Sequence, residues 1–323
     1  MPISLSANAF LSALTNLIAY TFVVPQFKDG DMDVLLSKCK YDDAPSGDGV
    51  VFRSAGVGAP ANLNPNASSL LSVNAPAGAT EQHIPITEYK VIPLTVNKRL
   101  LAQAFVSETG LSDYVAATLK GMETTKKFDI FTHMAGIIDA YVPTATKGNK
   151  TVNVFDVSSL TDPNQLAFAL DRNSKILLKE IAKDSKAMRY LTADYNDAAA
   201  PQVVDKEDLY LICTEDTRLG IDFDTLATNY NAGYISANNG WAGMVSIPDT
   251  YLPTWISNNI GCMLVHRDKF VYGFLYQFAG MFFDLSNLNE QHFMHYAFYA
   301  DDVHAVPAVA YTISASITPA ALS

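Results

Sequence analysis

Histidine and aspartate side chains that could bind a metal ion gather near the end of the chain. They are His292, His295, Asp301, Asp302 and His304. The aromatic residues around them favour a β-strand, in which successive side chains point to opposite faces. His292 and His295 would then lie on opposite faces of a sheet. We therefore expect ordinary strand and turn histidines here, and no metal site.

Two segments partly match phosphate-binding loops. Residues 56–61 read Gly-Val-Gly-Ala-Pro-Ala and fit the G-x-G-x-x-A pattern, which requires a helix directly after the glycines. Pro60, Pro65 and three nearby asparagines argue against such a helix. Residues 148–151 read Gly-Asn-Lys-Thr, but they lack the contiguous Gly-Lys and the upstream glycine of a P-loop. Neither segment predicts a nucleotide site.

Nucleophilic catalysis has little support in the sequence. There is no Gly-x-Ser-x-Gly elbow, and Cys39, Cys213 and Cys262 are widely separated, which predicts reduced, partly buried thiols. Acidic residues are concentrated in residues 194–249, where they could form a hydrolytic pair or a solvated acidic face. Their spacing does not favour a pair. We therefore expect no enzyme, no catalytic, cofactor-binding or metal-binding residues, and no cofactor.

Composition narrows the class of protein. The 323 residues include 22 Lys+Arg and 33 Asp+Glu, which gives a net charge of −11. The hydrophobic share of 49% and the charged share of 17% exclude intrinsic disorder, and the acidity argues against a nucleic-acid reader. No window reaches the ~18 uninterrupted apolar residues of a membrane span. A low charged fraction is typical of proteins that bury surface against other chains.

Hydrophobic periodicity predicts two long helices and a strand-rich last third. Apolar residues recur at three- and four-residue steps over residues 112–141 and again over 162–188, where Asp162-Pro163 is a typical helix start. Residues 208–214 predict a buried strand, and residues 260–317 contain successive strand-forming runs. This combination predicts an α+β fold.

Two segments before the first long helix do not resemble parts of a compact core. Residues 1–40 form an apolar arm, with a short helix capped by Ser6, that needs a surface to pack on. Residues 43–80 are rich in Gly, Pro, Asn, Ser and Ala, and a β-rich return follows over residues 84–96. Loops of this length are uncommon inside a compact domain. We expect a long two-stranded excursion that leaves the body and returns to it.

The order of these elements resembles the major capsid protein of tailed bacteriophages, the Hong Kong 97-type fold that encapsulin shells also use. Residues 86–134, which begin ITEYKVIPLTVNKRLL, look like the family's extended loop returning into its spine helix. Residues 207–231 (EDLYLICTEDTRLGIDFDTLATNYN) look like the apical-domain strand and the helix after it. Residues 265–284 (VHRDKFVYGFLYQFAGMFFD) look like the re-entry into the peripheral domain. The chain is most similar to the capsid proteins of small short-tailed phages.

The resemblance implies five parts along the chain. They are an N-terminal arm (1–42), an extended loop (43–100), a peripheral domain with the spine helix (101–155), an apical domain (156–265) and peripheral return strands (266–323).

The resemblance also implies a function and a set of partners. The chain would be a structural major capsid protein that self-assembles into hexamers and pentamers of an icosahedral virion head, built in the host cytoplasm. The head would enclose the DNA genome without sequence-specific binding and without a membrane. The arm is short and apolar, which points to a separate scaffolding protein, and a portal is also expected. An encapsulin-type shell or another virion protein is the alternative, followed by an α/β enzyme that uses residues 194–249.

Overall fold

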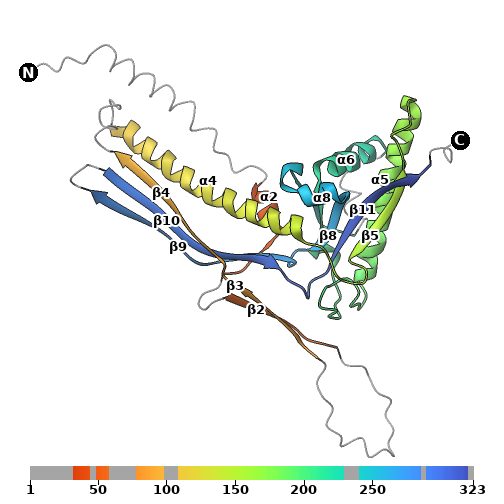
Figure 1. Cartoon of the computed structure of the whole chain (residues 1–323), viewed down its shortest axis with the longest axis horizontal. Helices are drawn as coiled ribbons and strands as arrows, with labels where there is room; N and C mark the ends of the chain where they lie inside the picture. Colours follow the sequence, from red (N-terminus) through yellow and green to blue (C-terminus); the bar gives the residue numbers. More distant parts are fainter. Residues whose placement is uncertain are drawn as a thin grey trace, which may run out of the picture.

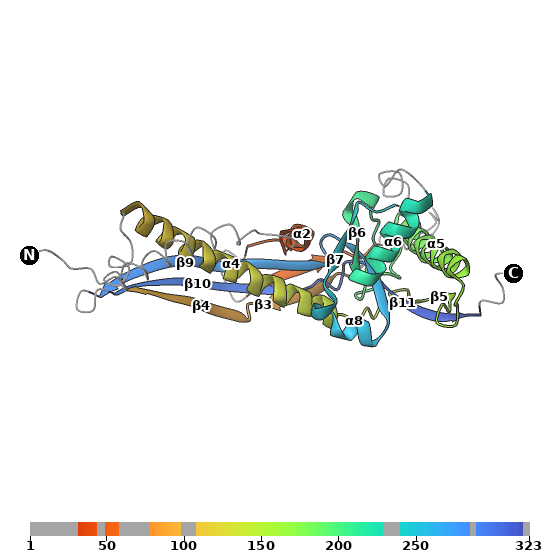
Figure 2. The same ribbon diagram turned by 90° about the horizontal axis from the view of Figure 1, so that it is seen from above.

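The chain folds around two sheets that lie in different halves of an elongated molecule (Figures 1 and 2). The structure is a computed structural model that describes residues 32–43, 49–57, 78–97, 108–228, 240–284 and 289–318. A four-stranded sheet occupies one half, a five-stranded sheet occupies the other, and a two-stranded ribbon projects between them. The predicted α+β class is confirmed.

The four-stranded sheet has the order β1-β9-β10-β4. Its members are β1 (Lys40–Tyr41), β9 (Phe270–Asp284), β10 (Asn289–Asp302) and β4 (Glu88–Asn97). β10 runs antiparallel to both β9 and β4, and the short β1 runs parallel to β9. The helix α4 (Glu108–Ala140) lies along one face of this sheet, as Figure 1 shows.

The helix α4 confirms the first predicted helix and begins four residues earlier than expected. Its 33 residues give a rod about 50 Å long, at about 1.5 Å per residue. The predicted apolar stripe is buried at Met122, Ile130 and Met134. Periodicity missed Phe131 and Ile138, which are also buried, because α4 contacts the sheet on one side and other helices on another.

The five-stranded sheet has the order β5-β11-β8-β6-β7. Its members are β5 (Asn149–Phe155), β11 (Ala308–Ile317), β8 (Ile260–His266), β6 (Leu209–Thr214) and β7 (Gly243–Ile247). The helices α5 (Pro163–Met188) and α6 (Glu215–Thr228) cover one face of it. The other face packs against the end of α4 and its neighbours in one continuous core.

The strand β6 is buried on both sides, as its apolar sequence predicted. Leu209 and Leu211 belong to the core under α5, whereas Tyr210 and Ile212 belong to the core shared with α4. The predicted second helix is confirmed as α5, and the side chain of Asp162 caps it by accepting a hydrogen bond of 2.9 Å from the backbone N–H of Asn164.

Four shorter elements complete the described fold. They are α2 (Met32–Leu36), α8 (Pro253–Ser257) and the 3₁₀ helices η3 (Lys206–Asp208) and η4 (Asp249–Tyr251). Three of them, α2, α8 and η4, contact α4. The helix α2 was not predicted, and it packs Leu35 and Leu36 into the core beside α4. The expected helix near Ser6 lies outside the described residues.

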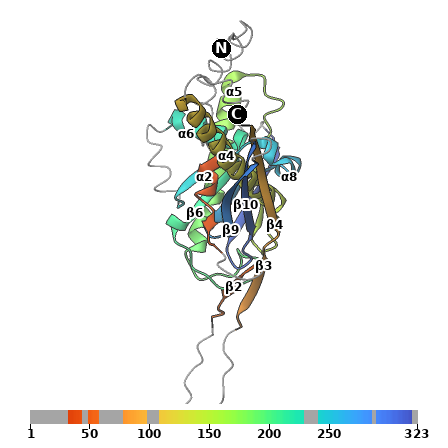
Figure 3. The same ribbon diagram turned by 90° about the vertical axis from the view of Figure 1, so that its left-hand side faces the viewer.

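The two-stranded ribbon consists of β2 (Gly49–Ser54) and β3 (Thr80–Pro85), paired antiparallel. It points away from both sheets, as Figures 1 and 3 show, which confirms a two-stranded excursion from the body. The expected β-rich return splits in two, because β3 stays in the ribbon while β4 pairs with β10 in the four-stranded sheet.

Sheet membership differs from the ranges expected from sequence. Those ranges put residues 149–155 and 308–317 with the spine helix, yet β5 and β11 both lie in the five-stranded sheet. The cause is that β11 pairs with β8 on one side and with β5 on the other. Such long-range pairing leaves no local signal in the sequence.

Candidate functional site

The histidines on β10 lie on opposite faces of the strand. On β10, His292 Nε2 lies 2.9 Å from the Oε1 atom of Glu290, while His295 faces the other side of the sheet and stacks on Phe278 with ring centroids 4.9 Å apart. The predicted alternation is therefore confirmed. In the part of the chain that the structure describes, no group of three His, Cys, Asp or Glu side chains is placed to hold a metal ion.

The lysine of the Gly-Asn-Lys-Thr segment belongs to a structural cluster. Lys150 Nζ lies 2.8 Å from the Oδ1 atom of Asp184 on α5. The same buried carboxylate accepts hydrogen bonds from the hydroxyls of Tyr195 and Tyr311, at 3.1 and 2.9 Å. Lys150 therefore anchors α5 to the five-stranded sheet. In the other glycine segment, residues 58–61 lie outside the described residues.

The three cysteines are free, buried thiols. Burial raises the pKa of Cys39 to about 12, and it also raises the pKa of Cys262 well above its usual range. A thiol is a nucleophile only as the thiolate, so Cys39 and Cys262 are protonated and unreactive at neutral pH.

Some of the carboxylates expected as an acidic face or a hydrolytic pair are local structural partners. Asp194 Oδ2 lies 2.6 Å from Lys147 Nζ, and Asp249 accepts a hydrogen bond from the backbone N–H at the start of α6. Asp197 instead lies in a polar cluster that sequence reasoning did not single out.

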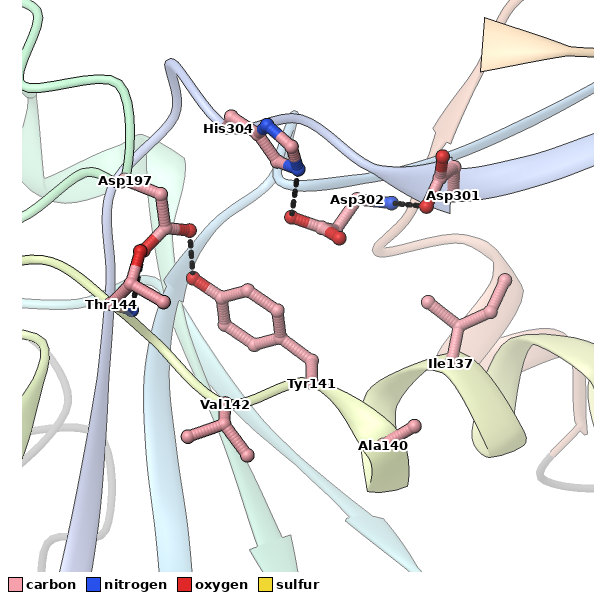
Figure 4. A pocket seen from close by; sticks show the side chains of 9 residues that line it. All are labelled: Ile137, Ala140, Tyr141, Val142, Thr144, Asp197, Asp301, Asp302 and His304. Atoms are coloured by element: carbon pink, nitrogen blue, oxygen red, sulfur yellow. Dashed lines mark hydrogen bonds and ion pairs between the residues drawn. The ribbon is translucent and has the colours of Figure 1, made fainter.

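This cluster lines a pocket of about 460 Å³ at the end of α4, shown in Figure 4. The segment after α4, the loop after α5 and the end of β10 all contribute to it. Its lining residues are Ile137, Ala140, Tyr141, Val142, Thr144, Asp197, Asp301, Asp302 and His304.

Asp197 has both carboxylate oxygens occupied. Its Oδ2 atom accepts a hydrogen bond of 2.6 Å from the hydroxyl of Tyr141, and its Oδ1 atom accepts bonds from the backbone N–H groups of Thr144 and Ala145, at 2.7 and 3.1 Å. A single side chain thus fixes the segment in which the chain leaves α4.

Lys269 completes the cluster from the start of β9, and its side chain is 0% exposed. Its Nζ atom lies 3.0 Å from the Oδ2 atoms of both Asp197 and Asp302, and it donates to the carbonyl of Val303 at 3.1 Å. It also lies 4.2 Å from the ring centroid of Tyr141, within cation–π range. We call Tyr141, Asp197, Lys269 and Asp302 the ionic joint.

The protonation states follow from this geometry. Burial opposes ionisation of Asp197, but the charge of Lys269 and the donated hydrogen bonds outweigh it and lower its pKa to about 2. Burial and the neighbouring Asp197 carboxylate raise the pKa of Tyr141, which stays protonated. Burial also raises the pKa of Asp301. Lys269 pairs with two carboxylates from different parts of the chain, so the joint binds these elements together.

Two exposed surfaces are better candidates than the pocket for contact with another protein chain. One is the ribbon of β2 and β3. The other is an aromatic face on the four-stranded sheet, where Tyr89, Phe278 and Phe282 are 63%, 56% and 60% exposed. Sequence reasoning identified the strand but not this face, although alternate positions in FVYGFLYQFAGMFF contain the signal. None of the described helices is long and apolar enough to cross a membrane.

Comparison with known families gives one match. The model of a family described as Phi29-like phage major capsid protein matches residues 7–312. No curated protein matches the chain.

Solved structures of similar fold come from phage capsids. The capsid structure of Staphylococcus phage Andhra gives a TM-score of 0.63 at 10% identity, covering 86% of this chain and 83% of that chain. The capsid structure of cyanophage P-SCSP1u gives 0.57 at 13% identity, covering 86% and 87%. The mature capsid of bacteriophage PhiM1 gives 0.53 at 9% identity, covering 87% and 86%.

Proposed function

The chain belongs to the family of Phi29-like phage major capsid proteins, and from this premise we propose that it builds the hexamers and pentamers of an icosahedral phage head. The resemblance to tailed-phage major capsid proteins and the Hong Kong 97-type fold are both confirmed. In this proposal the head encloses the DNA genome without reading its sequence, and it assembles in the host cytoplasm.

The observation that carries the proposal is the family match over residues 7–312, which includes the four-stranded sheet, the ribbon and all of the five-stranded sheet except the end of β11. The family favours a phage head over an encapsulin-type shell. A structural role also implies that the chain is not an enzyme. The saturated hydrogen bonding of Asp197 supports this, because the carboxylate is committed to holding the end of α4.

The ribbon supports contact between subunits. The end of the ribbon nearest the body is fixed in place, because Ile84 is buried there, at 1% exposed. The side chain of Gln82 donates a hydrogen bond to the carbonyl of Asp302 and accepts one from the backbone N–H of His304, both at 2.7 Å. Beyond this end, Arg53 and Glu81 pair at 2.9 Å while both stay exposed. A projecting ribbon with a fixed base is suited to lie on a neighbouring subunit.

The two sheets support a division into units that differs in detail from the one the resemblance implied. We propose that the four-stranded sheet with α4 is the peripheral unit, and that the five-stranded sheet with α5 and α6 is the apical unit. The ionic joint then lies where the two units meet. The parts that reach neighbours are then smaller than the N-terminal arm (1–42) and the extended loop (43–100) that the resemblance implied, because α2, β1 and β4 belong to the body.

The proposed head needs partners beyond the chain itself. A separate scaffolding protein and a portal are the partners that the resemblance to tailed-phage capsid proteins implies. They can be identified by asking which proteins allow the chain to form closed shells when they are produced together with it.

Removal of residues 45–77 tests the role of the ribbon. We expect this deletion to abolish shell formation, because it removes β2 and the segment between β2 and β3 while leaving residues 101–323 intact. Particle yield from gradient sedimentation measures the first effect, and circular dichroism checks the fold. Normal shells from the shortened chain would refute the proposed contact, and a collapsed body would refute the separation of ribbon and body.

A further inference from the structure

The four-stranded sheet has one covered face and one open face. On the covered face, the hydroxyl of Tyr296 donates to Asp129 of α4 at 2.9 Å, and Phe274 and Phe298 join the core under that helix. Figure 1 shows that no described helix lies on the opposite face.

A β-bulge determines which side chains reach the open face. Ala297 of β10 pairs with Tyr276, but the next residue pairs with Phe274, so Leu275 is the extra residue. Phe274 therefore faces α4, while Tyr276 and the alternate residues after it face away. Gln277 confirms this alternation, because its Oε1 atom accepts a hydrogen bond of 3.0 Å from Lys126 of α4.

The base of the open face is already covered. Ile84 and Ile86, which flank the end of β3, pack there against Val271, Ala297 and Tyr299 in a small separate core. The cover ends near Ala297, and from there to the far end of the sheet most large side chains of the face are aromatic or aliphatic and are exposed or partly exposed. We call this uncovered part the aromatic face; its main members are Tyr89, Val91, Tyr276, Phe278, Phe282, Phe293 and His295.

Several side chains of the aromatic face pack against one another. Phe278 lies between His295 and Tyr276, with ring centroids 4.9 and 5.9 Å away, and it remains 56% exposed. The pairing register places no Asp, Glu, Lys or Arg on this face over Tyr89–Thr95, Tyr276–Phe282 and Gln291–Ala297. A contiguous, uncharged patch of large apolar side chains marks an interaction surface.

The sheet edge beside the aromatic face is also open. Within the described residues, the outer edge of β9 pairs with another strand only at Val271 and Tyr272, where β1 is its partner. A peptide laid along this edge could bond to the backbone of β9 while its side chains contact the aromatic rings, as in β-strand addition. Such a peptide would extend along β9 the strand pairing that β1 makes at Val271 and Tyr272.

We propose that the aromatic face and the open edge of β9 bind residues 1–27 of a neighbouring copy of this chain. Those residues contain no Asp, Glu, Lys, Arg or His, but many Leu, Ile, Val, Ala and Phe. An uncharged apolar segment therefore matches an uncharged aromatic face. The chain continues at α2, which packs on the α4 side of the sheet. Residues 1–27 of the same chain would therefore have to pass around their own sheet to reach the aromatic face, whereas those of a neighbouring subunit would not. The proposal rests on the proposed shell function.

Disulfide trapping in particles tests both the site and the direction of the contact. One tagged chain carries Phe278→Cys, and a second chain with a different tag carries Phe10→Cys, Ile18→Cys or Val23→Cys. The native cysteines are buried and do not compete. After co-expression with the other head proteins, particle purification and mild oxidation, we expect a covalent dimer that carries both tags for at least one pair.

The control places the first cysteine elsewhere on the surface. Tyr190→Cys, at a side chain that is 76% exposed beyond the end of α5, should give no mixed dimer. A single chain that carries both cysteines, produced in the same way, reports on contact within one subunit. Cross-linking in this double variant without any mixed dimer from the separate chains would overturn the proposal, as would the absence of cross-linking from every pair. Particle formation itself reports on the proposed function, so the two ideas can fail separately.

A second measurement needs no variant. Hydroxyl-radical labelling of the wild-type chain should modify Tyr276, Phe278 and Phe282 at least fivefold less in particles than in the free chain, whereas Tyr190 serves as the reference. Equal labelling in the two states would overturn the proposal, because the aromatic face would then stay open in the shell.

Discussion

At the scale of single residues, the molecule depends on one buried cation. Lys269 is fully buried, and its ammonium is neutralised by Asp197 and Asp302 from two other parts of the chain. Separating two charges from water is costly, and removing one partner leaves the other buried and unpaired. The stability of the fold therefore depends on the complete set of charges in the ionic joint, because the loss of any one of them leaves another buried without a partner.

Replacement of the buried cation should be far more damaging than replacement of an exposed one. We expect Lys269→Met to lower the free energy of unfolding by about 3–5 kcal/mol, because two carboxylates lose their partner. Lys147→Met is the matched control; its pair with Asp194 is about half exposed, so we expect a loss below about 1 kcal/mol. Urea denaturation followed by circular dichroism measures both. Equal losses would show that burial of Lys269 has no special effect.

The pKa of Asp197 gives a pH dependence with a definite sign. Its pKa is about 2 in the folded chain against an ordinary 3.8, so its stabilising effect is complete above about pH 4 and is lost as the pH falls towards 2. The shift corresponds to about 2 kcal/mol. We expect the stability gap between wild type and Asp197→Asn to shrink between pH 5 and pH 2. A gap that stays constant over this range would contradict the assigned ion pair.

The sequence could not reveal this joint, since its members are far apart along the chain. Asp197 and Lys269 are separated by 72 residues, and neither stands in a recognisable motif. By contrast, the opposite orientation of His292 and His295 was predictable, because alternation within one strand is a local property.

At the scale of elements, β9 and β10 connect the covered and open faces of the four-stranded sheet. The bulge at Leu275 changes which residues of β9 face α4, and so it creates both the core around Phe274 and the aromatic face around Phe278. The strand β1 fixes the base of β9 through a close backbone approach at Gly273, where Asp42 lies against the strand.

Two glycines on β9 provide a matched test of that approach. A Cβ atom at Gly273 would overlap the carbonyl oxygen of Asp42, whereas one at Gly280 would meet nothing within 4 Å. We expect Gly273→Ala to lower the free energy of unfolding by at least about 2 kcal/mol, and Gly280→Ala to change it by less than about 0.5 kcal/mol. Chemical denaturation of both variants measures this. Equal stabilities would contradict the close approach of β1 to β9.

The elements themselves were more predictable than their pairing. The apolar spacing of α4 and α5, the Asp162 cap and the uniformly apolar β6 are local signals, and all of these elements are present. The union of β5 and β11 in the five-stranded sheet depends on register between residues more than 150 positions apart, which periodicity does not encode. The alternation of aromatic residues in β9 is a local signal for the aromatic face, but the bulge that decides which of them face away from α4 is not.

At the scale of the whole molecule, the low charged fraction of 17% has a structural explanation. The aromatic face is one uncharged surface, and residues 1–27 are another apolar, uncharged part of the chain. In a monomer both would expose apolar surface to water, whereas subunits of a closed shell can bury such surfaces against one another. Many cations have structural partners instead, as Lys269 and Lys150 show.

The most direct test of a shell subunit is electron microscopy of the wild-type chain produced with the other head proteins. We expect closed isometric particles in which the chain forms hexamers and pentamers, with the ribbon of β2 and β3 lying across a neighbouring subunit. If the chain remained a compact monomer under every assembly condition, alone and with a scaffolding protein, that result would contradict the proposed function.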